Sequence, residues 1–165
     1  MLDDTDAAAG AVLSPVAETV ESDRPMFRWT PVSGIKSYRV EVYDSNFDEV
    51  ASSGPVTGTE WRPDVPLRRG AVYTWVVAAG SKRFPQPPAP EARFEVLATE
   101  AAAEVERARA SGSRLLLAVA AGRHGLWLDA RQALDEAALD NPSHQGIRRL
   151  RDSLEARVKN SSRTR

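Results

Sequence analysis

The spacing of apolar residues changes close to Leu97, and this change restricts the possible folds more than any other feature of the chain. Before that point apolar and polar residues alternate, as in 36–44, and valine, threonine and aromatic residues are frequent. After it alanine, leucine, arginine and glutamate dominate. Alternation is typical of strands that contact water on one face, whereas the second composition is typical of helices. The sequence therefore predicts an all-β half followed by an all-α half.

About seven short strands are expected in the first half, separated by turns that contain glycine or proline. Four are clear and three are weaker: 26–30, 36–44, 72–79 and 92–97, then 16–20, 49–53 and 60–63. Charged residues occupy the outward positions, so we predict a seven-stranded antiparallel β-sandwich over 11–97. The acidic stretch 1–10 is expected to be a disordered tail.

Three to four helices are expected over 98–160, followed by a short disordered basic tail at 161–165. The expected helices cover 99–110, 114–123, 127–140 and a final stretch that ends near 158. Thr99, Ser113 and Ser143 are typical N-cap residues for the first, the second and the fourth of these helices. Apolar residues at helical spacing form one stripe along the last helix: Ile147, Leu150, Leu154 and Val158.

Few residues of the chain are of the types that catalyse reactions or bind metals. The 165-residue chain contains no cysteine and two histidines, His124 and His144, which excludes disulfides and cysteine-based zinc sites. No catalytic serine motif, zinc-protease motif or phosphate-binding glycine loop occurs. We therefore expect no catalytic residue, no metal and no cofactor, and we predict that the protein is not an enzyme.

Charge restricts the partners. The net charge of −1 provides no general attraction to nucleic acid or anionic membranes, and no apolar run reaches the roughly 18 residues of a membrane span. We expect a protein partner and no membrane span in this chain. The C-terminal part of the chain is a basic tail, with Arg148, Arg149, Arg151, Arg157 and Lys159. We expect it to be either a solvated face or a contact for an acidic partner. Nucleic acid is disfavoured as a partner because no RNA-binding aromatic pattern accompanies the basic residues.

The first half resembles a fibronectin type III-like domain. The matching positions are Trp29, Pro31, Gly34, 38–42, Leu67, Gly70, Tyr73, Trp75 and Val77. The resemblance implies that Trp29 is the core tryptophan of the sandwich. It also implies that Tyr73 is a tyrosine-corner residue, whose hydroxyl bonds back to the backbone.

The second half resembles one tetratricopeptide-type helical hairpin. Read from Leu117, the matching positions are Gly125, Trp127, Ala130, Leu134, Ala137 and Pro142. Continuing the 34-residue register reveals no second full repeat. A single repeat leaves an apolar face open unless a neighbour covers it. We expect this face to bind a protein partner, another copy of the chain included, through Arg114, Leu117, Ala121, Leu128 and Arg131.

The two halves together resemble the extracytoplasmic part of bacterial zinc-finger-type anti-sigma-factor-like membrane proteins. The resemblance lies in 25–44, in the proline-rich loop that ends in PAPEARFEVL, and in the hairpin that follows. It implies a periplasmic or membrane-associated location, whereas Met1 as the native start implies a cytoplasmic one. The Cys/His domain and membrane helix that precede this part in such proteins do not occur in the sequence.

Three functions follow as hypotheses. The leading one is a non-enzymatic interaction or scaffold protein that can self-assemble through the hairpin. The first alternative is the sensory module of an anti-sigma-like regulator, and the second is a carbohydrate-binding module that uses Tyr43 with Trp61.

The loop 82–90 also contains a PxxP spacing, Pro85 to Pro88, which is either a polyproline ligand or a stiff connection.

Overall fold

The structure is a computed structural model that describes residues 10–86 and 90–161, with side chains described as far as Ala156. It divides into two compact units, residues 1–98 and 99–165, which we call the β unit and the helical unit. This division lies one residue from the predicted boundary. The tails predicted at 1–10 and 161–165 lie outside the described residues except at Gly10 and Ser161, and Ser161 is the last residue of a helix.

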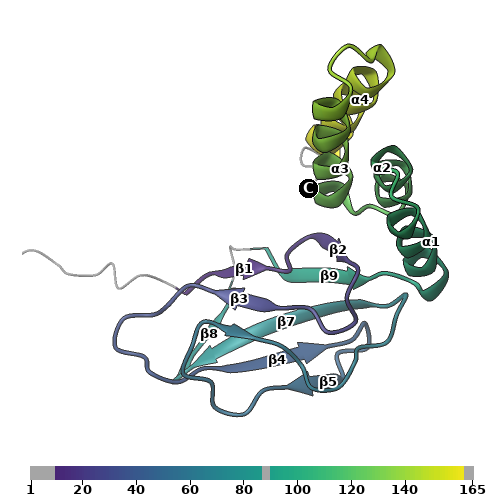
Figure 1. Ribbon diagram of the computed structural model, residues 1–165. Helices are drawn as coiled ribbons and strands as arrows, with labels where there is room; N and C mark the ends of the chain where they lie inside the picture. The colour runs from purple at the N-terminus through teal and green to yellow at the C-terminus, as the bar shows by residue number, and fades with distance from the viewer. Residues whose placement is uncertain (1–9, 87–89, 162–165) are drawn as a thin grey trace, which may run out of the picture. The chain divides into compact units, whose positions relative to one another are not determined.

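Two sheets form the β unit (Figure 1). Their nine described strands are β1 Val12–Ser14, β2 Glu18–Val20, β3 Phe27–Trp29, β4 Arg39–Tyr43, β5 Glu49–Ser52, β6 Glu60–Trp61, β7 Val72–Ala79, β8 Lys82–Phe84 and β9 Ala92–Val96. The three-stranded sheet has the order β1-β3-β6, and the six-stranded sheet has the order β2-β9-β7-β4-β5, with β8 also paired to β7. The prediction of about seven strands missed β1 and β8.

The prediction of a wholly antiparallel sandwich is wrong at one pair, because β2 runs parallel to β9. The cause lies between β1 and β2. Pro15 cannot donate a ladder hydrogen bond, and Ala17 has a φ of 54°, in the left-handed region. The extended chain is therefore interrupted after β1 and resumes in the other sheet, beside β9.

The strand β8 occupies part of the loop that we expected at 82–90. Gly80 has a φ of 63°, which allows a two-residue turn at Gly80 and Ser81 to send the chain back along β7. In the expected PxxP segment, Pro85 follows β8 directly, whereas Pro88 lies outside the described residues.

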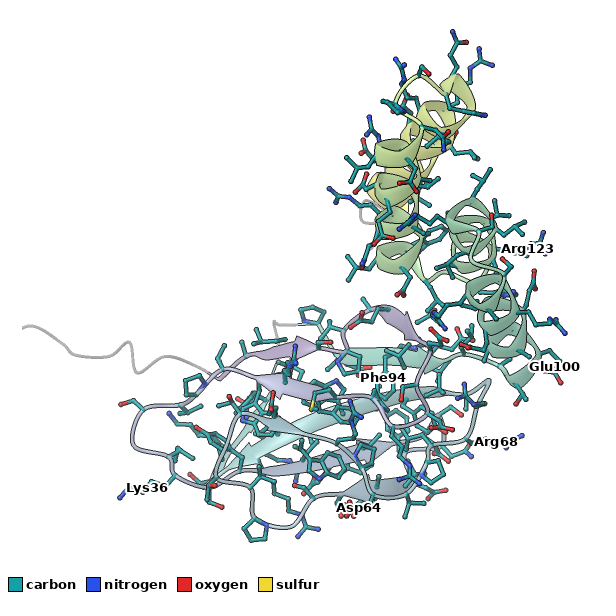
Figure 2. All side chains as sticks on the ribbon, in the orientation of Figure 1. Lys36, Asp64, Arg68, Phe94, Glu100 and Arg123 are labelled. Atoms are coloured by element: carbon teal, nitrogen blue, oxygen red, sulfur yellow. The ribbon has the colours of Figure 1, made fainter. Side chains whose placement is uncertain are left out.

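Aromatic and branched side chains fill the space between the two sheets. Phe27, Trp29, Trp75 and Phe94 are all fully or almost fully buried, and Phe94 is labelled on β9 in Figure 2. The indole N–H of Trp75 donates to the carbonyl of Pro15 at 2.8 Å. The indole nitrogen of Trp29 is equally buried, but it has no hydrogen-bond partner among the described residues.

Four helices form the helical unit: α1 Thr99–Ala110, α2 Arg114–Arg123, α3 Trp127–Asp140 and α4 Gln145–Ser161 (Figure 1). Helix α2 contacts both α1 and α3, and α3 contacts α4. Alanines at the α2–α3 contact let the two backbones approach closely, and Leu134 fills the space between them. These small side chains are Ala118, Ala133 and Ala137.

The predicted cap of α2 is confirmed, because the Ser113 hydroxyl accepts a hydrogen bond from the backbone N–H of Leu116 at 3.3 Å. The predicted cap of α1 is wrong by one residue, because Thr99 is already the first residue of that helix. The predicted cap of α4 is also wrong by one residue. His144 precedes the helix, and its Nδ1 accepts from the N–H of Ile147 at 3.4 Å. A turn from Asn141 to His144 delays the start of the helix and leaves Ser143 outside it.

Candidate functional site

Helices α2, α3 and α4 enclose a hollow of about 340 Å³ on the helical unit, which we call the helical groove. Helix α2 contributes one wall, α4 contributes the other, and α3 lies between them. The lining residues are Ala118, Val119, Gly122, Arg123, Trp127, Leu134, Leu150, Ser153 and Leu154. Seven of these nine side chains are apolar or absent, so the groove suits an apolar ligand.

Apolar surface in the groove remains open to solvent. Val119 on α2 is 43% exposed and Leu150 on α4 is 42% exposed, while Trp127 is half-buried. Gly122 has no side chain, and a Cβ at this position would lie in ordinary contact with Ala130 and Leu154, at 3.7 Å from each. Exposed apolar side chains that line a hollow are typical of a binding site.

One arginine lines the groove, Arg123, and two more are the sequence neighbours of its lining residue Leu150. Arg149 and Arg151 lie on either side of Leu150 on α4, and neither forms an ion pair with any residue that the structure describes. Arg123, labelled in Figure 2, donates to the Glu104 carboxylate on α1 at 2.6 Å. The rim therefore favours a ligand with acidic residues beside its apolar ones.

The Glu104 carboxylate connects α1 to the end of α2. The His124 Nε2 lies 2.8 Å from one carboxylate oxygen, and the Arg123 guanidinium contacts the other. The hydrogen bond from His124, and next the charge of Arg123, lower the pKa of Glu104 below its ordinary value. These contacts form an electrostatic link between α1 and the end of α2.

The partner face predicted from the sequence does not form one surface. Ala121 is fully buried and Leu117 packs partly against the core, because α2 turns both residues toward its neighbouring helices. Arg114 is engaged with α3, where it pairs with Glu136 at 2.8 Å and also with Asp140.

The two predicted α3 residues do face solvent. Leu128 is 78% exposed, and Arg131 is exposed and lies 3.8 Å from Asp135. Neither lines the helical groove. The prediction is therefore corrected: Ala121 belongs to the interior, and Arg114 links α2 to α3.

The remaining predicted residues are dispersed. In the basic tail, Arg148 donates to the carbonyl of Pro142 at 3.1 Å, and the side chains of Arg157 and Lys159 lie outside the described ones. Trp61 stacks on Phe27 with ring centroids 5.5 Å apart, in the three-stranded sheet. Tyr43 belongs to the other sheet, so the expected pair of sugar-binding aromatics comes from two different sheets.

Most of the groove was not anticipated from the sequence. The available signal was the apolar stripe of the last helix, whose members Leu150 and Leu154 line the groove. The stripe is wider than one neighbouring helix can cover, and the uncovered part becomes the site. Val119 and Gly122 carry no comparable signal in the sequence.

No family model matches this sequence, and no curated protein matches it. Within residues 10–86 and 90–161 there is no helix with the length and apolar character needed to cross a membrane. The same residues contain no group of three or more histidine, aspartate or glutamate side chains placed to hold a metal ion.

Proposed function

We propose that this protein is a non-enzymatic interaction module whose helical groove binds an apolar segment of a protein partner. The observation that carries the proposal is the open apolar surface of Val119 and Leu150 in a hollow of about 340 Å³. Apolar side chains left exposed in a hollow gain free energy when a partner removes them from water, at about 25 cal/mol per Å².

We propose that the partner segment is amphipathic and acidic. Arg149 and Arg151 neighbour Leu150 on α4 without an ion-pair partner among the described residues, so an acidic side chain on a bound segment can pair with one of them. Such pairs speed association and select partners, while the apolar contacts provide most of the affinity.

Within this proposal, the β unit is a fibronectin type III-like domain and the helical unit is a tetratricopeptide-like hairpin. The first likeness is supported by the hydroxyl of Tyr73, which donates to the carbonyl of Arg68 at 2.9 Å, and by the burial of Trp29. The second is supported by the buried alanines Ala130 and Ala137 on α3. In such an arrangement the β unit carries and spaces the binding unit.

The test is a selection of random peptides displayed on phage against the whole chain, followed by binding measurements with the enriched peptides. Peptides with clustered leucine or aromatic residues and flanking acids are expected. Leu150→Asp places a charge in the groove and should reduce their affinity at least about tenfold, because desolvating that charge costs more than 1.4 kcal/mol.

Leu128→Asp is the matched control, because it places the same charge on an exposed leucine outside the groove. It should leave the affinity unchanged. Peptides that bind both variants as well as the unaltered chain would contradict the proposed site, and a selection without enrichment would contradict the proposed function.

A further inference from the structure

The hairpin between β4 and β5 presents a phenyl ring to solvent. The Asp44 side chain accepts hydrogen bonds from the backbone N–H groups of Asn46 and Asp48, and the Asp44 carbonyl accepts from the N–H of Phe47. These bonds hold Phe47 at a φ of 64°, and its side chain is 76% exposed. The turn therefore displays the ring on a well-defined backbone.

Phe47 is an unfavourable residue for the turn itself. A φ of 64° suits glycine or asparagine, whereas a bulky side chain in this region is strained. Packing of the ring inside the β unit does not offset this strain, because Phe47 is 76% exposed. Strained residues of this kind cluster at sites of function, which suggests that the ring is used outside its own unit.

The surroundings of Phe47 are acidic. Asp48 and Glu49 follow it directly and are exposed, although Glu49 pairs with Arg39 at 3.9 Å, and Asp44 is half-buried at the base of the turn. The Asp48 carboxylate makes no ion pair with any residue of the described ranges. An aromatic ring beside the Asp48 carboxylate matches the chemistry of the helical groove, which is apolar inside and has the exposed Arg149 next to its lining residue Leu150 on α4.

We propose that Phe47 of one copy of this chain docks into the helical groove of a second copy. The inference rests on the proposed function and names the partner. Charge complementarity between Asp48 and Arg149 of α4 orients the contact, and burial of the ring provides the affinity. Since the two surfaces differ, the contact is heterologous, and each copy retains one free surface after pairing.

The experiment uses two variants that each lack one surface. Phe47→Asn removes the ring and keeps the turn, while Leu150→Asp blocks the groove and keeps the ring. The mass of each full-length chain is measured by light scattering over concentrations up to roughly 1 mM, alone and in equimolar mixture. Val65→Asn serves as the control, because it removes another exposed apolar side chain of the β unit.

The unaltered chain and the control are expected to rise above 18.0 kDa with concentration. Each of the two variants alone should remain at the monomer mass, and their mixture should form a one-to-one complex. Phe47→Asn should also raise the melting temperature by roughly 4 °C or more, because asparagine tolerates the left-handed backbone better.

Association of Phe47→Asn as strong as that of the unaltered chain would overturn the proposal. So would a mixture of the two variants that forms no complex, or a lower melting temperature of Phe47→Asn. If the mass of the unaltered chain stays constant with concentration, a second copy is not the partner. The proposed function would still hold in that case, provided that Leu150→Asp loses the binding of the selected peptides.

Discussion

The two buried tryptophans of the β unit provide a matched pair for measuring one hydrogen bond. Trp75→Phe removes the indole N–H that donates to the carbonyl of Pro15 at 2.8 Å, and Pro15 is itself fully buried. Trp29→Phe removes an indole N–H that has no partner among the described residues. Both changes delete the same atoms, and each ring has an aromatic neighbour, Phe27 at 4.9 Å or Tyr38 at 5.7 Å.

The packing losses therefore largely cancel in the difference between the two variants. A buried carbonyl that loses its donor costs about 1–3 kcal/mol, whereas removing an unpaired buried N–H recovers part of its desolvation penalty. We expect Trp75→Phe to lower the free energy of unfolding by roughly 2 kcal/mol more than Trp29→Phe does. This difference corresponds to a melting temperature lower by about 8 °C or more in a domain of this size.

Native-state hydrogen exchange of the β7 backbone amides is the suitable assay, because it reports the stability of the β unit within the whole chain. It also does not depend on tryptophan fluorescence, which both variants alter. Equal stabilities of the two variants, or a larger loss in Trp29→Phe, would refute the assignment of the hydrogen bond to Trp75 alone.

Three further predictions concern single contacts. Tyr73→Phe should cost about 1 kcal/mol, since the bond to the Arg68 carbonyl is lost, and unchanged exchange in β7 would contradict this. Ser113→Ala should cost about 1 kcal/mol in the helical unit, measured by exchange of the α2 amides, and the cap assignment fails if those amides keep their protection. The lowered pKa of Glu104 stabilises the helical unit above about pH 4.5, and this gain is lost as the pH falls through the lowered pKa. His124→Ala should therefore reduce the loss of helical-unit stability as the pH falls, measured by circular dichroism at a series of pH values. An unchanged pH dependence would contradict the contact.

Helices were the most predictable part of the chain because their ends are specified locally. Ser113 caps α2, and Gly112 and Gly125 adopt φ values of 71° and 76° in the turns on either side of it. Each helix begins and ends within three residues of its predicted limits. The displaced cap of α4, at His144, results from a turn whose hydrogen bonds the sequence pattern does not reveal.

Strand pairing was less predictable because it depends on partners that are distant in the chain. Alternation identified β7 and β9 as strands, since each buries every second residue. Alternation does not reveal which strand lies beside which, so the parallel pairing of β2 with β9 was not foreseen. The short strand β8 was hidden among prolines, although Gly80 marks the turn before it.

The candidate site shows the same division. Hydrophobic period and capping residues act over a few positions, so the residue pattern was enough to predict a β unit, a helical unit and the apolar stripe of α4. Which apolar residues remain uncovered depends on how the elements pack. Ala121 is buried, whereas Leu150 lines an open groove and Phe47 stands exposed at the end of a hairpin. The exposure of a side chain depends on how many elements surround it and how close they are. The spacing of residues along one helix carries no information on these neighbours.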